Sequence, residues 1–370
     1  MYRDVIRHVE NYSARPAYHA CRLYYSIGKY AHKMIMDQAG HAILYYNPNP
    51  EDNWSLNSQF NQLADAIKRE KGNIKEINSD IELVREVAKH ITLFGRRPVV
   101  LSHYKKRLQR LRGIHKRIEL VTYYTHSTLN VTKEVVDMLS KSTLVMCMNY
   151  KEIGYLKNVG VPESILGLFP LAAGPREIET KARLQSEKRS CDFIFALKYS
   201  KNRSYTLRKN YEKAIQVIER LAEYGYRVTI VGPGWNGNLF KRYFSNGESS
   251  VVVYEDISRE KQLEVFGNAY IFVNMSTFEG GPLPLVDAYC NDCGIASSPT
   301  GFLVELLWKH ICEAVLLNPY DTVEEITSVC INALEERRKR RPSYAPLPWC
   351  FTFEAAAKKI ISLEKQCVQE

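Results

Sequence analysis

The sequence lacks any long uninterrupted apolar run. No hydrophobic stretch approaches the roughly 20 residues needed to cross a bilayer, and the residues from Met1 to His8 lack the apolar core of a signal peptide. Low-complexity segments and internal repeats are absent as well. We therefore expect a cytoplasmic protein without membrane-spanning helices.

The sequence also lacks the cysteine spacing of a disulfide framework. Its nine cysteines are odd in number and scattered, as is typical of free thiols in a reducing compartment. Cys290 and Cys293 form a C-x-x-C motif, but no second pair or neighbouring histidine completes a zinc site. The motif also falls at the end of an expected helix, whereas a redox motif opens one. We expect no metal site and no redox cofactor.

What the chain does have is the length and composition of two globular domains. It contains 370 residues, of which 45% are hydrophobic and 25% are charged, as in soluble proteins. Strand-like and helix-like segments alternate along it, which predicts an α/β fold with mostly parallel sheets. The expected strands cover residues 41–46, 98–103, 119–126, 144–148 and 165–169, then 191–197, 227–231, 250–254, 270–275, 294–297 and 313–317. The helices expected among the later strands cover 209–224, 235–244, 259–268, 283–290, 302–309 and 322–339, a doubly wound pattern.

The net charge of +10 is concentrated in the first half of the chain. Residues 1–175 contain 25 Lys and Arg against 16 Asp and Glu, which leaves the remainder nearly neutral. Nine of these cations follow one another without an intervening acid, namely Arg96, Arg97, Lys105, Lys106, Arg107, Arg110, Arg112, Lys116 and Arg117. Leu108, Leu111 and Ile114 are spaced by three among them, which predicts a basic amphipathic helix that can lie on an anionic bilayer. A nucleic-acid or polyanion-binding protein is the alternative, although interleaved aromatic residues and known binding motifs are missing.

One loop carries most of the chemistry, between the expected strand 270–275 and the helix expected to begin at Leu283. Gly280 and Gly281 allow a ligand to approach the backbone closely, and the free amides at the helix start face an anion. Glu279 and Asp287 add two carboxylates, separated by seven residues, near the carboxyl end of the sheet. This combination predicts a ligand that carries hydroxyls and phosphates, although a Rossmann-like unit of another function can also hold a glycine loop beside one acid.

The two acids, the small-residue loop and the flanking strand and helix resemble the donor-binding motif of retaining GT-B glycosyltransferases, in particular glycosyltransferase family four. Asp287 stands where the family has a glutamate that holds the ribose. The resemblance implies two Rossmann-like doubly wound domains facing a central cleft. It implies an acceptor-side domain over residues 1–175, a nucleotide-sugar-binding domain over 176–350 and a helix over 351–370 that crosses back to the first domain.

Further residues match the family in order and spacing. Lys198 and Lys209 stand where the family has an Arg and a Lys that grip the donor diphosphate. Gly234 lies in a glycine turn whose main role we interpret as structural, close to the nucleotide. Asp256 and Ile257 lie in the loop that is expected to contact the nucleobase. The resemblance places Gly280, Gly281 and Leu283 at the donor as well.

On the acceptor side, His126 matches the family's loop that closes over the donor sugar, and the basic residues Lys105, Lys106, Arg107 and Arg110 form the expected acceptor or membrane face. The resemblance implies a metal-independent, retaining transfer of a sugar from a nucleoside diphosphate sugar to a saccharide or lipid-linked acceptor in glycan or polysaccharide biosynthesis. Glu279 and His126 are its expected catalytic residues. No cofactor and no nucleic acid are expected, and the enzyme is expected in the cytoplasm or at the inner face of a membrane. A GT-B protein that binds nucleotide without catalysis is the alternative.

Overall fold

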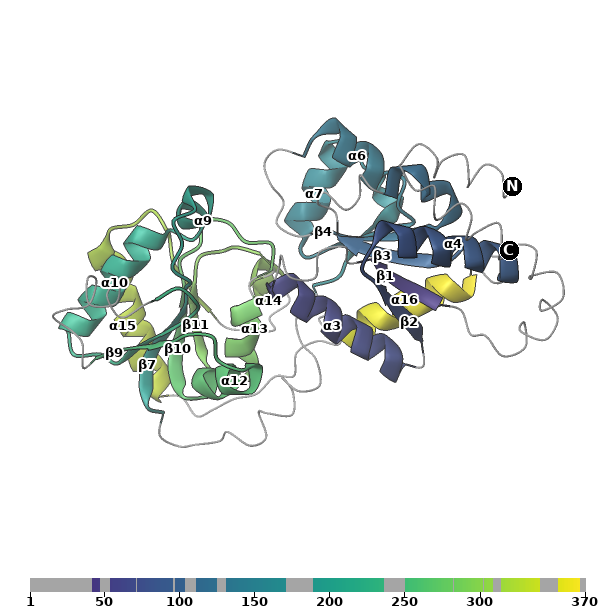
Figure 1. The fold of residues 1–370 in the computed structure, drawn as a ribbon. Coiled ribbons are helices and arrows are strands. Elements are labelled where there is room, and N and C mark those ends of the chain that lie inside the picture. Colours follow the sequence, from purple (N-terminus) through teal and green to yellow (C-terminus); the bar gives the residue numbers. More distant parts are fainter. Residues whose placement is uncertain are drawn as a thin grey trace. The chain divides into compact units, whose positions relative to one another are not determined.

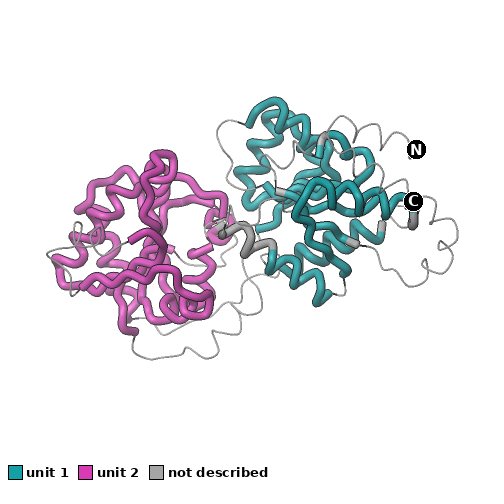
Figure 2. The backbone as a smooth tube through the Cα atoms, in the orientation of Figure 1, with its two compact units in different colours: residues 1–171, 349–370 teal, residues 172–348 magenta. Residues whose placement is uncertain are grey.

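The computed structural model describes residues 42–46, 54–70, 72–95, 97–103, 111–124, 131–170, 189–235, 250–281, 283–301, 303–308, 314–339 and 352–366. The chain divides into two compact units, which Figure 2 shows in different colours. Unit 1 comprises Met1–Leu171 and Trp349–Glu370, and unit 2 comprises Ala172–Pro348. Each unit is described by itself.

Unit 1 contains a six-stranded parallel sheet in the order β2-β1-β3-β4-β5-β6 (Figure 1). Its strands are β1 (Ala42–Tyr46), β2 (Asn73–Ile77), β3 (Val99–His103), β4 (Glu119–Tyr124), β5 (Leu144–Cys147) and β6 (Leu166–Leu168). Both β4 and β5 are buried along nearly their whole length, which is typical of parallel strands covered on both faces. Five of these strands were predicted from the sequence and are confirmed, whereas β2 was not predicted.

The helices of unit 1 are α3 (Trp54–Arg69), α4 (Asp80–Phe94), α6 (Lys133–Leu139), α7 (Tyr150–Asn158) and α16 (Phe353–Gln366). The last of these comes from the far end of the chain and packs against α3. Arg69 of α3 donates to Glu354 of α16 at 2.7 Å, and Phe353 and Ile360 of α16 are buried. The C-terminal helix is therefore an integral part of unit 1.

The prediction of a basic α-helix after β3 is wrong for the residues that the structure describes there. Residues 111–117 form two short 3-10 turns, Leu111–Gly113 and His115–Arg117, in place of a continuous α-helix. Leu111 is fully buried and Ile114 is 7% exposed, because both side chains pack into the core of unit 1. These two residues of the expected apolar stripe are therefore not available to a bilayer.

Unit 2 contains a second six-stranded parallel sheet, in the order β12-β11-β10-β7-β8-β9. Its strands are β7 (Cys191–Ala196), β8 (Val228–Val231), β9 (Val251–Tyr254), β10 (Ala269–Asn274), β11 (Gly294–Ser297) and β12 (Ala314–Leu316). The order is that of a doubly wound Rossmann sheet, in which the chain reverses direction across the sheet between β7 and β10. The α/β doubly wound prediction is confirmed.

The described helices of unit 2 are α9 (Arg203–Arg208), α10 (Tyr211–Glu223), α12 (Arg259–Gly267), α13 (Leu283–Cys290), α14 (Leu303–Trp308) and α15 (Val323–Lys339). The single helix expected over 209–224 instead begins at Tyr211 and follows a separate helix, α9. Asn210 takes the left-handed conformation with φ of 50° and so breaks the chain between the two helices. The helix expected over 235–244 lies outside the described residues except for Trp235.

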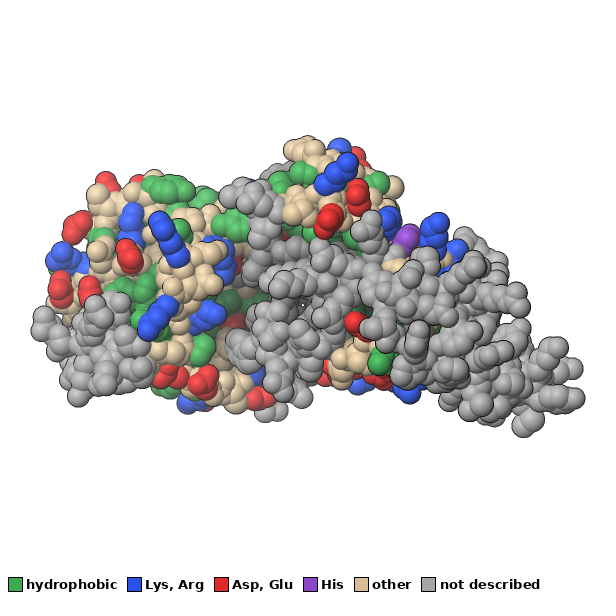
Figure 3. Space-filling view, turned by 45° about the horizontal axis from the view of Figure 1, so that its top comes forward, with side chains coloured by type: hydrophobic (Ala, Val, Ile, Leu, Met, Phe, Trp, Pro, Cys, Tyr) green, Lys and Arg blue, Asp and Glu red, His purple; other side chains and the backbone are tan. Residues whose placement is uncertain are grey.

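Within the part of the chain that the structure describes, none of the helices combines the length and the apolar character needed to span a membrane. Figure 3 shows Lys and Arg side chains on the visible face of unit 2 interspersed with Asp and Glu.

Candidate functional site

The site predicted from the sequence lies at the carboxyl ends of the strands of unit 2. Parallel sheets of this topology bind ligands outside the carboxyl ends of the strands, at the point where the strand order reverses. Here that point is between β7 and β10, which pair along their length. Lys198 follows β7, and the loop that contains Glu279 follows β10. The fold therefore brings together two segments that are far apart in the sequence.

Buried hydroxyl and amide groups fix the start of this loop. Ser276 is fully buried, and its hydroxyl donates to the side-chain oxygen of Asn274 at 2.8 Å. Asn274 in turn donates to the hydroxyl of Ser297 at 3.0 Å, and the hydroxyl of Ser298 donates to the carbonyl of Ser276. These bonds join the end of β10 to the end of β11, so the loop that follows has a fixed origin.

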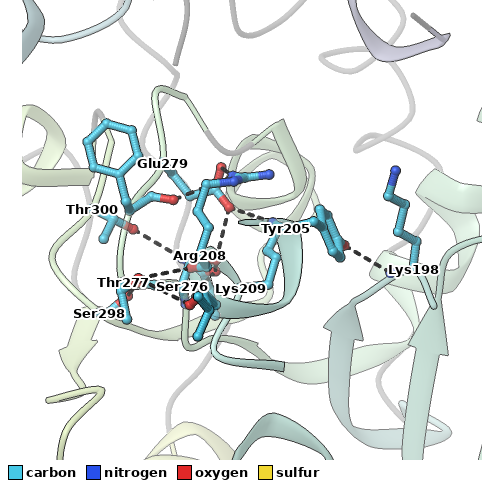
Figure 4. A network of polar contacts seen from close by, with 12 residues as sticks. Lys198, Tyr205, Arg208, Lys209, Ser276, Thr277, Glu279, Ser298 and Thr300 are labelled. Atoms are coloured by element: carbon cyan, nitrogen blue, oxygen red, sulfur yellow. Dashed lines mark hydrogen bonds and ion pairs between the residues drawn. The ribbon is translucent and has the colours of Figure 1, made fainter. Parts of the chain in front are cut away.

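Glu279 is the centre of the site, because two cations and one hydroxyl converge on its carboxylate (Figure 4). Arg208 Nη1 lies 2.6 Å from Oε2, and Lys209 Nζ lies 2.6 Å from Oε1. The hydroxyl of Ser276 lies 2.9 Å from Oε1. The side chain of Glu279 is only 4% exposed, so these partners offset the cost of burying its charge.

Lys198 and Arg208 both approach the ring of Tyr205. Lys198 Nζ lies 4.8 Å from the ring centroid and the guanidinium carbon of Arg208 lies 5.5 Å from it, distances suited to cation–π interactions. The hydroxyl of Tyr205 accepts the backbone N–H of Lys198 at 3.3 Å. Burial raises the pKa of Tyr205 to about 12, so the phenol remains protonated at neutral pH. Tyr205 thereby links the loop after β7 to α9.

The site carries an excess of positive charge. Arg208 and Lys209 share a single carboxylate, that of Glu279. Lys198 lies over the ring of Tyr205 and has no carboxylate partner among the described residues. The helix α13 begins directly after the loop and adds the partial positive charge of its N-terminus. The sum favours an anionic ligand.

Asp287, expected to present its carboxylate to a ribose, is fully buried inside unit 2. Arg259 Nη1 donates to Oδ2 at 2.7 Å, and Arg259 Nη2 pairs with Oδ1. Gln262 donates to Oδ2 at 2.8 Å. The side chain of Arg259 is 28% exposed, so in this arrangement Arg259 reaches the surface and Asp287 does not.

The glycine turn after β8 is a tight structural connection. A side chain at Gly232, where φ is 155°, would place its Cβ 2.6 Å from the carbonyl oxygen of Leu197. A Cβ at Gly234, where φ is 92°, would lie 3.0 Å from the carbonyl oxygen of Tyr199. Trp235 completes the contact by donating its indole N–H to the carbonyl of Leu197 at 2.8 Å. The turn thus supports the segment from which Lys198 extends.

The remaining expected donor residues lie at the same edge of unit 2. Asp256 is exposed in the loop after β9, in the left-handed conformation with φ of 46°, and Ile257 beside it is half-buried. Gly280 is buried, while Gly281 and Leu283 are half-buried at the start of α13. These residues lie in the segments that follow the carboxyl ends of β9 and β10.

The residues expected on the acceptor side lie outside the described residues. These are His126, Lys105, Lys106, Arg107 and Arg110. Their expected roles therefore stay predictions.

Four groups at the site were not predicted from the sequence. Arg208 and Tyr205 come from α9, while Arg259 and Gln262 come from α12. Arg208 directly precedes Lys209 in the sequence, and this position could have identified it as a residue of the site. Arg259 and Gln262 reach Asp287 only through the packing of α12 against α13, which no spacing in the sequence reveals.

Comparison with known proteins gives matches in structure alone. No family model matches the sequence, and no curated protein sequence matches it. Among solved structures, the chain resembles a trehalose-6-phosphate synthase with a TM-score of 0.63 at 13% identity, over 88% of this chain and 99% of that one. It resembles the sucrose-phosphate synthase of Thermosynechococcus elongatus with a TM-score of 0.60 at 15% identity, over 88% and 98%. It also resembles Anabaena HepE in complex with UDP and glucose, with a TM-score of 0.56 at 10% identity, over 89% and 98%. The chain therefore has the GT-B fold of these proteins.

Proposed function

We propose that the protein is a glycosyltransferase of the retaining type that uses a nucleoside diphosphate sugar. The observation that carries this proposal is the buried carboxylate of Glu279, held between Arg208 and Lys209 at the reversal point of a Rossmann sheet. A cationic site beside a fixed carboxylate suits a diphosphate attached to a sugar. The named activities of two structural neighbours, trehalose-6-phosphate synthase and sucrose-phosphate synthase, and the UDP and glucose bound to a third support the same reading.

The positive charge would serve the departing diphosphate. Charge builds up on the leaving phosphate as the sugar–oxygen bond breaks, and fixed cations in a partly buried site stabilise that charge. We propose Lys198, which follows β7, and Lys209, which precedes the break before α10, for this role. The amides of Gly280, Gly281 and Leu283 at the start of α13 would add hydrogen bonds. We propose that these groups make a metal ion unnecessary.

Glu279 would act on the sugar. An oxocarbenium-like transition state carries positive charge, which a buried carboxylate stabilises more strongly than a solvated one. Glu279 would also accept hydrogen bonds from sugar hydroxyls, and His126 would contact the sugar from unit 1. Retention of configuration without an enzymic nucleophile is what the resemblance to family four implies.

The nucleoside would extend along the edge of unit 2. Asp256 and Ile257 after β9 and Gly234 after β8 are the proposed neighbours of the base. Asp287 would act at the ribose through Arg259, because its own oxygens are buried and paired.

A saccharide or a lipid-linked saccharide is the proposed acceptor, in glycan or polysaccharide biosynthesis in the cytoplasm. The basic residues Lys105, Lys106, Arg107 and Arg110 are the proposed acceptor face. Leu111 and Ile114 lie in the core and cannot insert into a bilayer. These two residues would therefore add no apolar contact to an anionic membrane, and the basic residues would bind it through their charge.

Binding of nucleotide without catalysis is the second candidate. One observation favours it, since both oxygens of Asp287 are already paired with Arg259. Turnover of a donor sugar distinguishes the two, because a protein that only binds nucleotide leaves the donor intact.

Thermal unfolding of the whole chain with added ligands tests the donor class. We expect UDP or GDP at about 100 times its Kd to stabilise the protein by about 2.7 kcal/mol, a shift of several degrees in Tm. The corresponding nucleosides at equal concentration should stabilise it far less, because they lack the diphosphate. Stabilisation by an oligonucleotide but by neither nucleoside diphosphate would contradict the proposal and favour a polyanion-binding protein.

A further inference from the structure

Arg208 stands outside the set of residues that the donor motif predicts, yet it occupies the centre of the site. It is the last residue of α9 and directly precedes Lys209. Its Nη1 atom donates to Glu279 Oε2 at 2.6 Å and lies 3.4 Å from the carbonyl of Phe278. The side chain is 23% exposed, so it is mostly buried but reaches the surface of the site.

Most of the donors of this guanidinium have no acceptor among the described residues. A guanidinium carries five N–H groups in a fixed fork. Only Nη1 of Arg208 donates to another described residue, whereas Nη2 and Nε have no acceptor in the described part of the chain. A partly buried fork with these donors available is suited to an anion with several oxygens, such as a phosphate.

The arrangement of charges points to the same kind of ligand. Lys198 and Arg208 approach one ring, that of Tyr205, at 4.8 and 5.5 Å from its centroid, and Figure 4 shows them on either side of it. Lys209 adds a third cation on the other oxygen of Glu279. Two cations on one carboxylate and a third on the other side of the Tyr205 ring repel one another, and an anion bound among them relieves that repulsion.

We propose that Arg208 binds the diphosphate of the donor, and that it exchanges Glu279 for the phosphate when the donor enters. The inference rests on the proposed function and deepens it. Arg208 supplies the bidentate fork that lysine at position 198 cannot supply. Its movement from Glu279 Oε2 to phosphate takes this cation away from the oxygen, which can then accept a hydrogen bond from a hydroxyl of the donor sugar. Lys209 and Ser276 keep the other oxygen, Oε1, in place.

The exchange couples donor binding to the state of the carboxylate. Without donor, Glu279 has both oxygens occupied and its charge is offset twice. With donor, one cation is withdrawn, so the carboxylate gains effective negative charge at the time when the sugar requires it. A nucleoside without phosphate does not trigger this change.

Calorimetric titration of the full chain with UDP, with GDP in parallel, tests the first part. Arg208→Gln should weaken binding of the nucleoside diphosphate by about tenfold to a hundredfold, as for a lost hydrogen-bonded charge. The affinity for uridine or guanosine should change less than about twofold, because these nucleosides have no phosphate for Arg208 to bind. Arg208→Lys should fall between wild type and Arg208→Gln, because it keeps the charge but loses the fork.

Arg203→Gln is the matched control. Arg203 is the first residue of the same helix and is exposed, so it gives the same change in net charge away from the site. Its affinity for UDP should equal that of wild type. Unfolding curves and circular dichroism identify any variant that has lost its fold. A folded Arg208→Gln that binds UDP as tightly as wild type would overturn the proposal and leave Arg208 as a partner of Glu279 alone.

Glu279→Gln tests the exchange. Arg208 no longer has to leave a charged partner in this variant, so affinity for UDP should rise severalfold, and the rise should vanish in the Arg208→Gln background. A fall in affinity would show that Glu279 holds Arg208 in place for the phosphate, which overturns the exchange. Failure of the proposed function gives a different result, because wild type would then bind neither UDP nor GDP.

Discussion

Asp287 and Arg259 form an ion pair in which both carboxylate oxygens are held by one guanidinium, and the acid is fully buried while the base is partly exposed. The two residues lie on neighbouring helices, α13 and α12. This asymmetry in burial has a consequence for stability. Removing the base leaves a buried charge, whereas removing the acid leaves a cation that can still reach water.

We expect Arg259→Gln to destabilise the protein by about 3 to 5 kcal/mol, as for a buried ion pair that loses one partner. Asp287→Asn should cost less, because Arg259 regains hydration. The double variant should be more stable than Arg259→Gln alone. Denaturant unfolding of the four proteins gives the comparison, and equal losses in the two single variants would contradict this account of the pair.

Glu279→Gln keeps the shape of the side chain but removes its charge. We expect turnover of the donor to fall by at least about a hundredfold, or roughly 3 kcal/mol of transition-state stabilisation, without loss of nucleotide binding. Steady-state kinetics and titration with UDP separate the two effects. Activity within threefold of wild type would remove Glu279 from the catalytic residues.

Lys198→Ala and Lys209→Ala each remove a cation from the proposed diphosphate site. We expect each to weaken binding of a nucleoside diphosphate by about 1.5 to 3 kcal/mol, with the nucleoside nearly unaffected. Lys201→Ala is the control, since Lys201 is exposed on the same loop as Lys198 and should bind as wild type. Parallel losses for nucleoside and diphosphate would show that the lysines act on the fold.

The glycine turn gives a prediction about stability alone. Gly232→Ala places a Cβ 2.6 Å from the backbone oxygen of Leu197, so the backbone has to move, and we expect a loss of at least about 2 kcal/mol. Gly225→Ala is the control, because Gly225 also has a positive φ, of 81°, but no atom near the new Cβ. It should lose only about 1 kcal/mol from backbone strain. Similar losses at both positions would contradict the close approach of the two loops.

Most of the fold of unit 2 was predictable because its core strands are continuously apolar. Segments such as Cys191–Ala196 and Ala269–Asn274 are buried on both faces, and their pattern identifies them without tertiary information. In unit 1, Asn73–Ile77 was missed. This edge strand reads N-I-K-E-I, with Lys75 paired to Glu86 at 3.0 Å, and its charge hides the strand pattern.

The site was predictable as far as the carboxyl ends of strands determine it. Glu279 and Lys198 could be placed because each follows a strand. Lys209 was expected to open a helix but lies at the end of α9, two residues before α10. The partners of Asp287 and the second cation on Glu279 could not, because Arg259 and Arg208 reach these carboxylates only through tertiary packing. The prediction of a basic amphipathic helix was wrong for a related reason. Leu111 and Ile114 have the spacing of a helix face, but both side chains pack into the core.

On the proposed function, the carboxyl edge of unit 2 activates a nucleoside diphosphate sugar. Incubation of the whole protein with a panel of UDP- and GDP-sugars, followed by proton NMR of the released sugar, tests it most directly. We predict that one donor is hydrolysed, that the sugar first appears with the anomeric configuration of the donor, and that Glu279→Gln abolishes the signal while Arg203→Gln does not. Tight binding of a nucleoside diphosphate with no hydrolysis or transfer of any donor sugar would contradict the claim and leave a nucleotide-binding protein of the same fold.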